Sequence, residues 1–123
     1  TKASRMTDTA YRKGLAGESR AAEYLQKRGM VLLEKRYRSP FGEIDLVMRD
    51  GETLVFVEVK ARGTGRRGTG LMAVGRRKQA KLVKTALQYL GQRGWGGPVR
   101  FDTVELTADG IQHIVNAFEA SEY

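Results

Sequence analysis

The sequence predicts a single α/β domain, in which helices alternate with the strands of one sheet. Three patterns predict it. A helical pattern fills the first quarter of the 123-residue chain, a hairpin pattern follows over residues 43–60, and a second helical pattern precedes another strand. A chain of this length accommodates one domain, and no linker or internal repeat interrupts it, so residues 1–123 are expected to form one unit.

The first helix is predicted from about Thr7 to Arg28, after a disordered segment at residues 1–6. Thr7 or Asp8 can cap its N-terminus, and Gly29 can end it. The inward stripe at helical spacing consists of Tyr11, Leu15, Ala22 and Leu25.

Glu18 falls in the middle of that apolar stripe, where an unpaired carboxylate would be costly. It could be a buried glutamate paired with an arginine, or a glutamate directed at a metal ion. The helix pattern alone leaves both interpretations open.

A strand at residues 30–37, expected at the rim of the sheet, leads into a hairpin. The segments GEIDLVMR and LVFVEVK flank Asp50-Gly51, a strong turn signal. The second hairpin strand is apolar on both faces, which is typical of a central, buried strand.

The spacing of this hairpin groups three chemically active residues. Side chains alternate along a strand, so Glu58 and Lys60 share a face, and an even loop places Asp45 on it too. A four-residue loop sets Asp45 directly opposite Glu58, with Cβ atoms roughly 5 Å apart. A two-residue loop at Asp50-Gly51 makes them diagonal neighbours, and a three-residue loop separates them.

Two adjacent carboxylates repel each other unless a cation neutralises them or one is protonated. Oxygen ligands suit magnesium or manganese, and a nearby lysine can orient water or stabilise charge on a phosphoryl group. These groups could hydrolyse a phosphodiester. The alternative is a structural ion pair with a spare carboxylate.

The net charge of +8 and the pI of about 10.0 indicate a polyanionic partner, although solubility alone would also explain them. No acidic residue occurs between Glu58 and Asp102, and residues 61–73 are expected to form a mobile basic loop. We expect a nucleic acid as the partner, and composition alone does not distinguish DNA from RNA. The expected nucleic-acid contacts are Arg62, Arg66, Arg67, Arg76, Arg77, Lys78 and Lys81.

A second helix is predicted over about residues 75–91, and its basic N-terminal half opposes the helix dipole. Gln79 extends its inward stripe, which otherwise consists of Leu82, Val83, Ala86, Leu87 and Leu90. The segment VRFDTVELT then predicts a strand, followed by a short strand or turn.

Several site classes are excluded. The chain has no cysteine, so thiolate zinc sites, disulfides and thiol nucleophiles are impossible. A single histidine, His113, rules out a multi-histidine metal site. No apolar run is long enough to span a membrane and the N-terminus has no signal-peptide pattern, so a cytoplasmic protein without membrane contact is expected.

Taken in order, these motifs resemble the PD-(D/E)xK nuclease superfamily. They resemble more closely the YraN family of small bacterial proteins, described as endonucleases distantly related to archaeal Holliday junction resolvases. The resemblance covers roughly Tyr11 to Phe118. Its motifs are Gly17-Glu18, GEIDL with Asp45, FVEVKxR with Glu58 and Lys60, and Arg100-Phe-Asp102.

The resemblance implies a restriction-endonuclease-like core, with a mixed sheet flanked by helices. It also implies metal ligands at Asp45 and Glu58, a supporting acid at Glu18 and a catalytic lysine at Lys60. Gln79 would match a glutamine found in some active sites of the superfamily. Ile44 stands where the superfamily motif has a variable proline.

The function expected from this resemblance is magnesium- or manganese-dependent cleavage of DNA, including branched or junction DNA. A homodimer would fit, because a junction is cut symmetrically on two strands. Two alternatives remain: a nucleic-acid-binding protein without catalytic activity, and a basic structural protein that associates with assemblies such as ribosomes.

Overall fold

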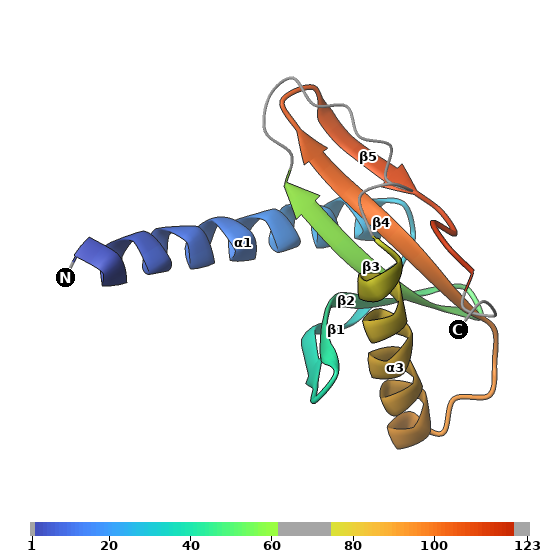
Figure 1. Ribbon diagram of the computed structural model, residues 1–123. Helices are drawn as coiled ribbons and strands as arrows, with labels where there is room; N and C mark the ends of the chain where they lie inside the picture. Colours follow the sequence, from blue (N-terminus) through green and yellow to red (C-terminus); the bar gives the residue numbers. More distant parts are fainter. Residues whose placement is uncertain (1, 62–74, 120–123) are drawn as a thin grey trace.

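The part of the chain that the structure describes forms two helices and five strands (Figure 1). The computed structural model describes residues 2–61 and 75–119, with side chains from residue 14 onward. The elements in chain order are α1 (Lys2–Lys27), β1 (Val31–Ser39), β2 (Gly42–Asp50), β3 (Thr53–Ala61), α3 (Arg76–Arg93), β4 (Val99–Thr107) and β5 (Gly110–Ile114). Within these ranges, neither helix is apolar enough over a sufficient length to cross a membrane.

The strands form one sheet in the order β1-β2-β3-β4-β5. β3 and β4 run parallel, and the other neighbouring pairs run antiparallel. The chain passes through α3 between the two parallel strands, as a parallel pair requires a crossover. The predicted α/β class with a mixed sheet flanked by helices is confirmed, as are the central position of β3 and the rim position of β1.

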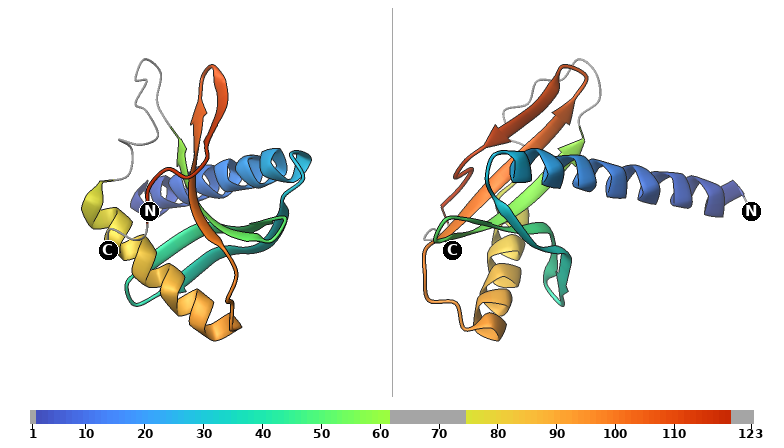
Figure 2. Two further views of the ribbon diagram at one scale, coloured as in Figure 1. Left: turned by 90° about the vertical axis from the view of Figure 1, so that its right-hand side faces the viewer. Right: turned by 180° about the vertical axis from the view of Figure 1, so that it is seen from behind.

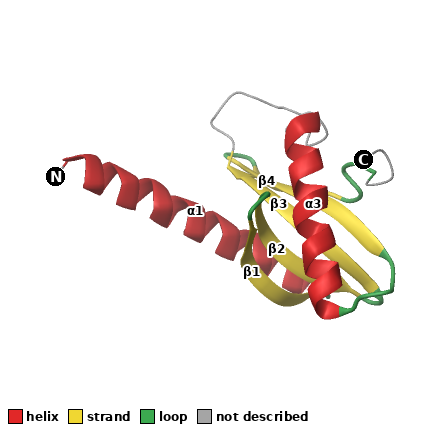
Figure 3. Cartoon of the chain, turned by 60° about the horizontal axis from the view of Figure 1, so that its bottom comes forward, coloured by secondary structure: helices red, strands yellow, loops and turns green. Residues whose placement is uncertain are grey.

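Each helix covers one face of the sheet (Figures 2 and 3). α3 packs on an aromatic layer in which Tyr89 meets Tyr37 and Phe56 edge-on and Phe56 stacks on Phe101. The C-terminal half of α1 packs on an aliphatic layer that includes Leu25, Leu46, Met48, Val55 and Val57. The N-terminal half of α1 extends beyond the sheet (Figure 2).

The β2–β3 turn consists of two residues, Gly51 and Glu52. Gly51 has a φ of 61°, which glycine adopts without steric cost. Asp50 pairs with Thr53, and the register continues to Leu46 opposite Val57. One further step sets Asp45 opposite Glu58. The predicted even loop is therefore correct, and because the turn lies one residue later than Asp50-Gly51, the two acids are direct rather than diagonal neighbours.

Some local predictions were wrong. α1 begins at Lys2 rather than at Thr7. Leu87 is 61% exposed because α3 turns Thr85 and Tyr89 toward the sheet instead. The side chain of Tyr11 and the predicted mobile loop beyond Ala61 lie outside the described residues.

A buried aspartate ties β4 to β5 and to the segment that follows. The carboxylate of Asp102 is fully buried and accepts hydrogen bonds from Arg100 Nε at 2.8 Å and Nη2 at 3.0 Å, and from the Asn116 N–H at 2.9 Å. His113 Nε2 lies 2.7 Å from the same carboxylate. Burial opposes ionisation, but these partners outweigh it and lower the pKa of Asp102.

We expect Asp102→Asn to destabilise the protein by about 3 kcal/mol, because it removes the fully buried carboxylate that holds the partly buried Arg100 through two hydrogen bonds. Asp50→Asn removes the exposed contact of the same arginine, at 3.1 Å, and should cost less than about 1 kcal/mol. Urea denaturation of both variants measures the difference. Equal losses would mean that Asp102 is not the anchor of this region.

Candidate active site

An open pocket of ≈ 490 Å³ lies at the carboxyl end of β3. Its charged side chains come from four elements: Glu18 from α1, Asp45 from β2, Glu58 and Lys60 from β3, and Lys78 from α3. The four residues that the sequence motifs predicted as catalytic are therefore brought to one pocket. Lys78 joins them, although the charge pattern predicted it as a nucleic-acid contact.

Asp45 occupies the centre of this pocket. Its Oδ2 accepts a hydrogen bond of 2.8 Å from the backbone N–H of Val59, which fixes the carboxyl against β3. Burial, followed by repulsion from Glu58, raises the pKa of Asp45 to about 8. Without a bound cation, the Asp45 side chain therefore keeps a proton at neutral pH and can donate it to Glu58.

Glu18 reaches the pocket because α1 lies close to the sheet. At Gly17, an added Cβ would come within 3.1 Å of the Leu106 side chain, so glycine permits this approach. Glu18 is only 7% exposed and accepts a hydrogen bond of 2.9 Å from Arg36 Nε. Burial raises the pKa of Glu18 despite the opposing effect of Arg36. The two sequence interpretations are thus not exclusive: Glu18 has an arginine partner and also lines the pocket.

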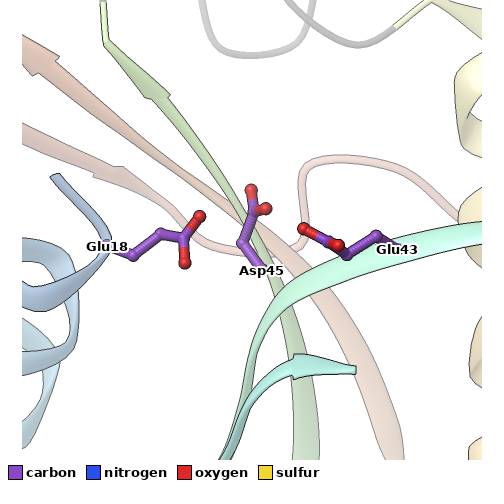
Figure 4. A group of neighbouring side chains, drawn as sticks. All are labelled: Glu18, Glu43 and Asp45. Carbon is purple, nitrogen blue, oxygen red and sulfur yellow. The ribbon is translucent and has the colours of Figure 1, made fainter. Parts of the chain in front are cut away.

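Glu43 is an acid that the sequence reasoning missed. Carboxylate oxygens of Glu18, Glu43 and Asp45 all lie within 4.8 Å of one another, and Figure 4 shows Glu18 and Glu43 reaching toward Asp45 from opposite sides. The GEID motif could have identified Glu43. Glu43 lies two residues before Asp45 on the same strand, and residues two apart on a strand share a face. Glu43 is also held by Arg38, whose Nε lies 2.7 Å from its Oε2.

Arg36 was missed as well, and it links these acids. Besides its contact with Glu18, its Nη1 lies 3.8 Å from Glu43 Oε1. Arg36 has a φ of 51°, an uncommon backbone conformation for a residue other than glycine. The β1–β2 register places it opposite Asp45, four residues past the start of a β-bulge at Leu32. No sequence pattern marks a positive φ at an arginine within a strand.

The remaining acid, Glu58, is 6% exposed and is held by two lysines. Its Oε1 lies 3.6 Å from Lys60 Nζ and forms a closer ion pair with Lys78 Nζ. The neighbouring Lys78 ammonium, together with burial, lowers the pKa of Lys60. Burial of Lys78 lowers its pKa, but its contact with Glu58 has the larger combined effect and the pKa of Lys78 is raised. Lys78 therefore stays cationic.

The other predicted site residues are placed differently. Arg76, Arg77 and Lys81 are exposed on α3, where nucleic acid could reach them. Gln79 is half-buried on the same helix and is not among the described residues that line the pocket. Arg62, Arg66 and Arg67 lie outside the described residues.

The donor set fits a hard divalent cation. The acids supply only carboxylate oxygens, which magnesium and manganese prefer, and the described pocket contains neither sulfur nor imidazole donors. The raised pKa of Asp45 records repulsion and burial that a cation would relieve. Glu18, Glu43 and Asp45 converge closely enough to share an ion, and Glu58 could join once it is free of its lysines.

Several known proteins match this chain over most of its length and most of their own. A UPF0102 protein of Geobacter metallireducens is 45% identical over 111 residues, covering 86% of this chain and 91% of the relative. UPF0102 proteins of Thermodesulfovibrio yellowstonii and Nitrosomonas europaea are 43% and 42% identical, covering 85% and 92% of this chain and 94% and 98% of those proteins. The model of the uncharacterised protein family UPF0102 matches residues 17–106, from Gly17 through the pocket to Leu106. The chain belongs to the UPF0102 family.

Proposed function

We propose that this protein is a magnesium- or manganese-dependent endonuclease that hydrolyses phosphodiester bonds in DNA. One observation carries the proposal: Glu18, Asp45, Glu58 and Lys60 line the same pocket, although they come from three elements. The order of these residues is that of the PD-(D/E)xK superfamily, to which we assign the family. The pocket also opens beside a helix whose first turns carry exposed arginine and lysine.

In this proposal Asp45, Glu58 and Glu18 hold the cation, with Glu43 adding charge beside them. A bound divalent cation supplies neutralisation of the phosphodiester charge and a nucleophile at neutral pH. Val59 holds Asp45 in place through its N–H, and Arg36 holds Glu18 and Glu43. These contacts orient the acids before substrate binds, which reduces the reorganisation needed during the reaction.

Lys60 has the role of positioning the attacking water and accepting its proton. The lowered pKa of Lys60 favours the neutral amine that this role requires. When it is protonated, the same side chain can stabilise charge on the phosphate instead. Its side chain is 28% exposed, so it can reach a substrate in the open pocket.

DNA would be held through its backbone by Arg76, Arg77 and Lys81 on α3, joined by the basic residues of the preceding segment. None of these side chains implies reading of base edges, so recognition of phosphate position and shape is expected. Branched or four-way DNA is our preferred substrate within this class, and a two-fold dimer would cut it symmetrically.

A cleavage panel tests the activity. Linear, nicked, flapped and four-way DNA, with matched RNA, are incubated with Mg²⁺, Mn²⁺ or EDTA. Metal-dependent cleavage supports the proposal. Binding that weakens with salt but yields no cleavage under any condition would favour the nucleic-acid-binding alternative, and salt-insensitive binding would count against both.

Lys60→Ala and Asp45→Asn should each lower the cleavage rate by about 10²- to 10⁴-fold, because one removes the proton acceptor and the other a metal ligand. DNA binding in EDTA and the circular dichroism spectrum should change little. Matched controls are Lys27→Ala, whose lysine is 75% exposed on α1, and Asp50→Asn on the hairpin. Wild-type rates in the site variants would show that the residues are assigned wrongly.

Because the pKa of Asp45 is raised, we expect the free energy of unfolding to depend on pH. This pKa is raised from 3.8 to about 8 in the folded state, so the folded state binds the proton more tightly, and stability falls as pH rises between these values. In EDTA, Asp45→Asn should therefore melt about 5 °C or more above wild type at pH 8, with a smaller gap at pH 5.

Adding Mn²⁺ at pH 8 should raise the melting temperature of wild type and not that of Asp45→Asn. A wild type that is more stable than Asp45→Asn at pH 8 in EDTA would contradict the assignment of a strained acid at this position.

A further inference from the structure

Lys78 makes a contact that its expected role as a surface nucleic-acid residue does not explain. It lies in the first turn of α3, and its ammonium forms an ion pair with Oε1 of Glu58 inside the pocket. The Glu58 side chain is 7% exposed, whereas that of Lys78 is 43% exposed. The contact therefore joins a buried acid to a lysine whose side chain is nearly half exposed.

A buried carboxylate needs a positive partner, since an uncompensated charge in such a position is costly. Arg36 serves this purpose for Glu18 and Glu43. For Glu58, the available cations among the described residues are Lys60 and Lys78, and Lys78 is the closer of the two. Lys78 thus supplies positive charge to Glu58.

The same Glu58 oxygen cannot serve an ammonium and a divalent cation equally well, because the two positive charges would repel each other. Lys60 is anchored on β3 two residues from Glu58 and is the less exposed lysine. Lys78 comes from a different element and has Arg77 and Lys81 exposed nearby on its own helix. It is therefore the lysine that can leave with little rearrangement.

Resting on the proposed function, we infer that Lys78 is an internal counter-ion of Glu58 that a divalent cation displaces, and that the displaced ammonium then contacts a phosphate of the bound DNA. Lys78 is a positioning residue in this scheme. It holds Glu58 while the pocket lacks a cation, and it adds a DNA contact when the cation is present. Metal binding and DNA binding thereby strengthen each other, and by linkage the effect is reciprocal.

Titration calorimetry with Mn²⁺, in the absence of DNA, tests the first half. Lys78→Met removes the competing cation and should tighten Mn²⁺ binding by about three- to tenfold, the range expected for losing a partly exposed ion pair. Lys78→Gln should act in the same direction. Lys84→Met removes the same charge from the same helix, but Lys84 lies 5.8 Å from the Phe41 ring, outside the pocket, and its effect should stay within about twofold.

The salt dependence of DNA binding tests the second half. Lys60→Ala and Lys60→Ala/Lys78→Met are compared, because loss of Lys60 keeps the DNA intact during the measurement. In EDTA the slopes of log affinity against log salt should agree. With Mn²⁺ the protein that retains Lys78 should show a slope steeper by about one phosphate contact.

The outcomes separate the two proposals. If wild type neither binds Mn²⁺ nor cleaves any DNA, the proposed function fails and this inference fails with it. If wild type binds Mn²⁺ and cleaves, but Lys78→Met binds the ion equally or more weakly, only the counter-ion role is overturned. Equal salt slopes in Mn²⁺ would overturn the transfer of Lys78 to phosphate.

Discussion

The electrostatic conflict between Asp45 and Glu58 is the constraint on which the rest of this structure depends. The two acids lie opposite each other on adjacent strands of the sheet, where burial and the charge of Glu58 raise the pKa of Asp45. A hydrophobic pair would stabilise the sheet at this position, so the acids weaken the fold they occupy. The surrounding structure must therefore compensate for them, and its unusual features are concentrated there.

These features are positive groups supplied from three directions. Arg36 on β1 adopts a positive φ and contacts Glu18 and Glu43, while Lys60 on β3 and Lys78 on α3 contact Glu58. Asp45 itself is held by the backbone N–H of Val59, which donates a hydrogen bond of 2.8 Å to its Oδ2. Strained backbone and incompletely compensated charge at one place are the features expected of a site kept for function.

The sequence predicts the hairpin and the inward position of Glu18, because both follow from the periodicity of strands and helices. Alternation along β3 fixed the face of Glu58 and Lys60, and helical spacing directed Glu18 inward. Arg36 and Lys78 could not be found in this way. Arg36 depends on a bulge and a positive φ, and Lys78 depends on how α3 lies across the sheet, which is set by the packing of Tyr89, Phe56 and Tyr37. Family membership likewise says nothing of such contacts.

Two aspartates of the same sheet, the partly buried Asp45 and the fully buried Asp102, differ in the partners that surround them. Asp102 receives Arg100, His113 and the Asn116 N–H, and its pKa is lowered. Asp45 receives one backbone donor and lies beside the acids Glu18, Glu43 and Glu58, and its pKa is raised to about 8. Burial opposes ionisation at both positions, so their different partners decide the outcome. Among the described residues, Asp102 already has its positive partners, whereas the carboxyl of Asp45 would gain more from a bound cation.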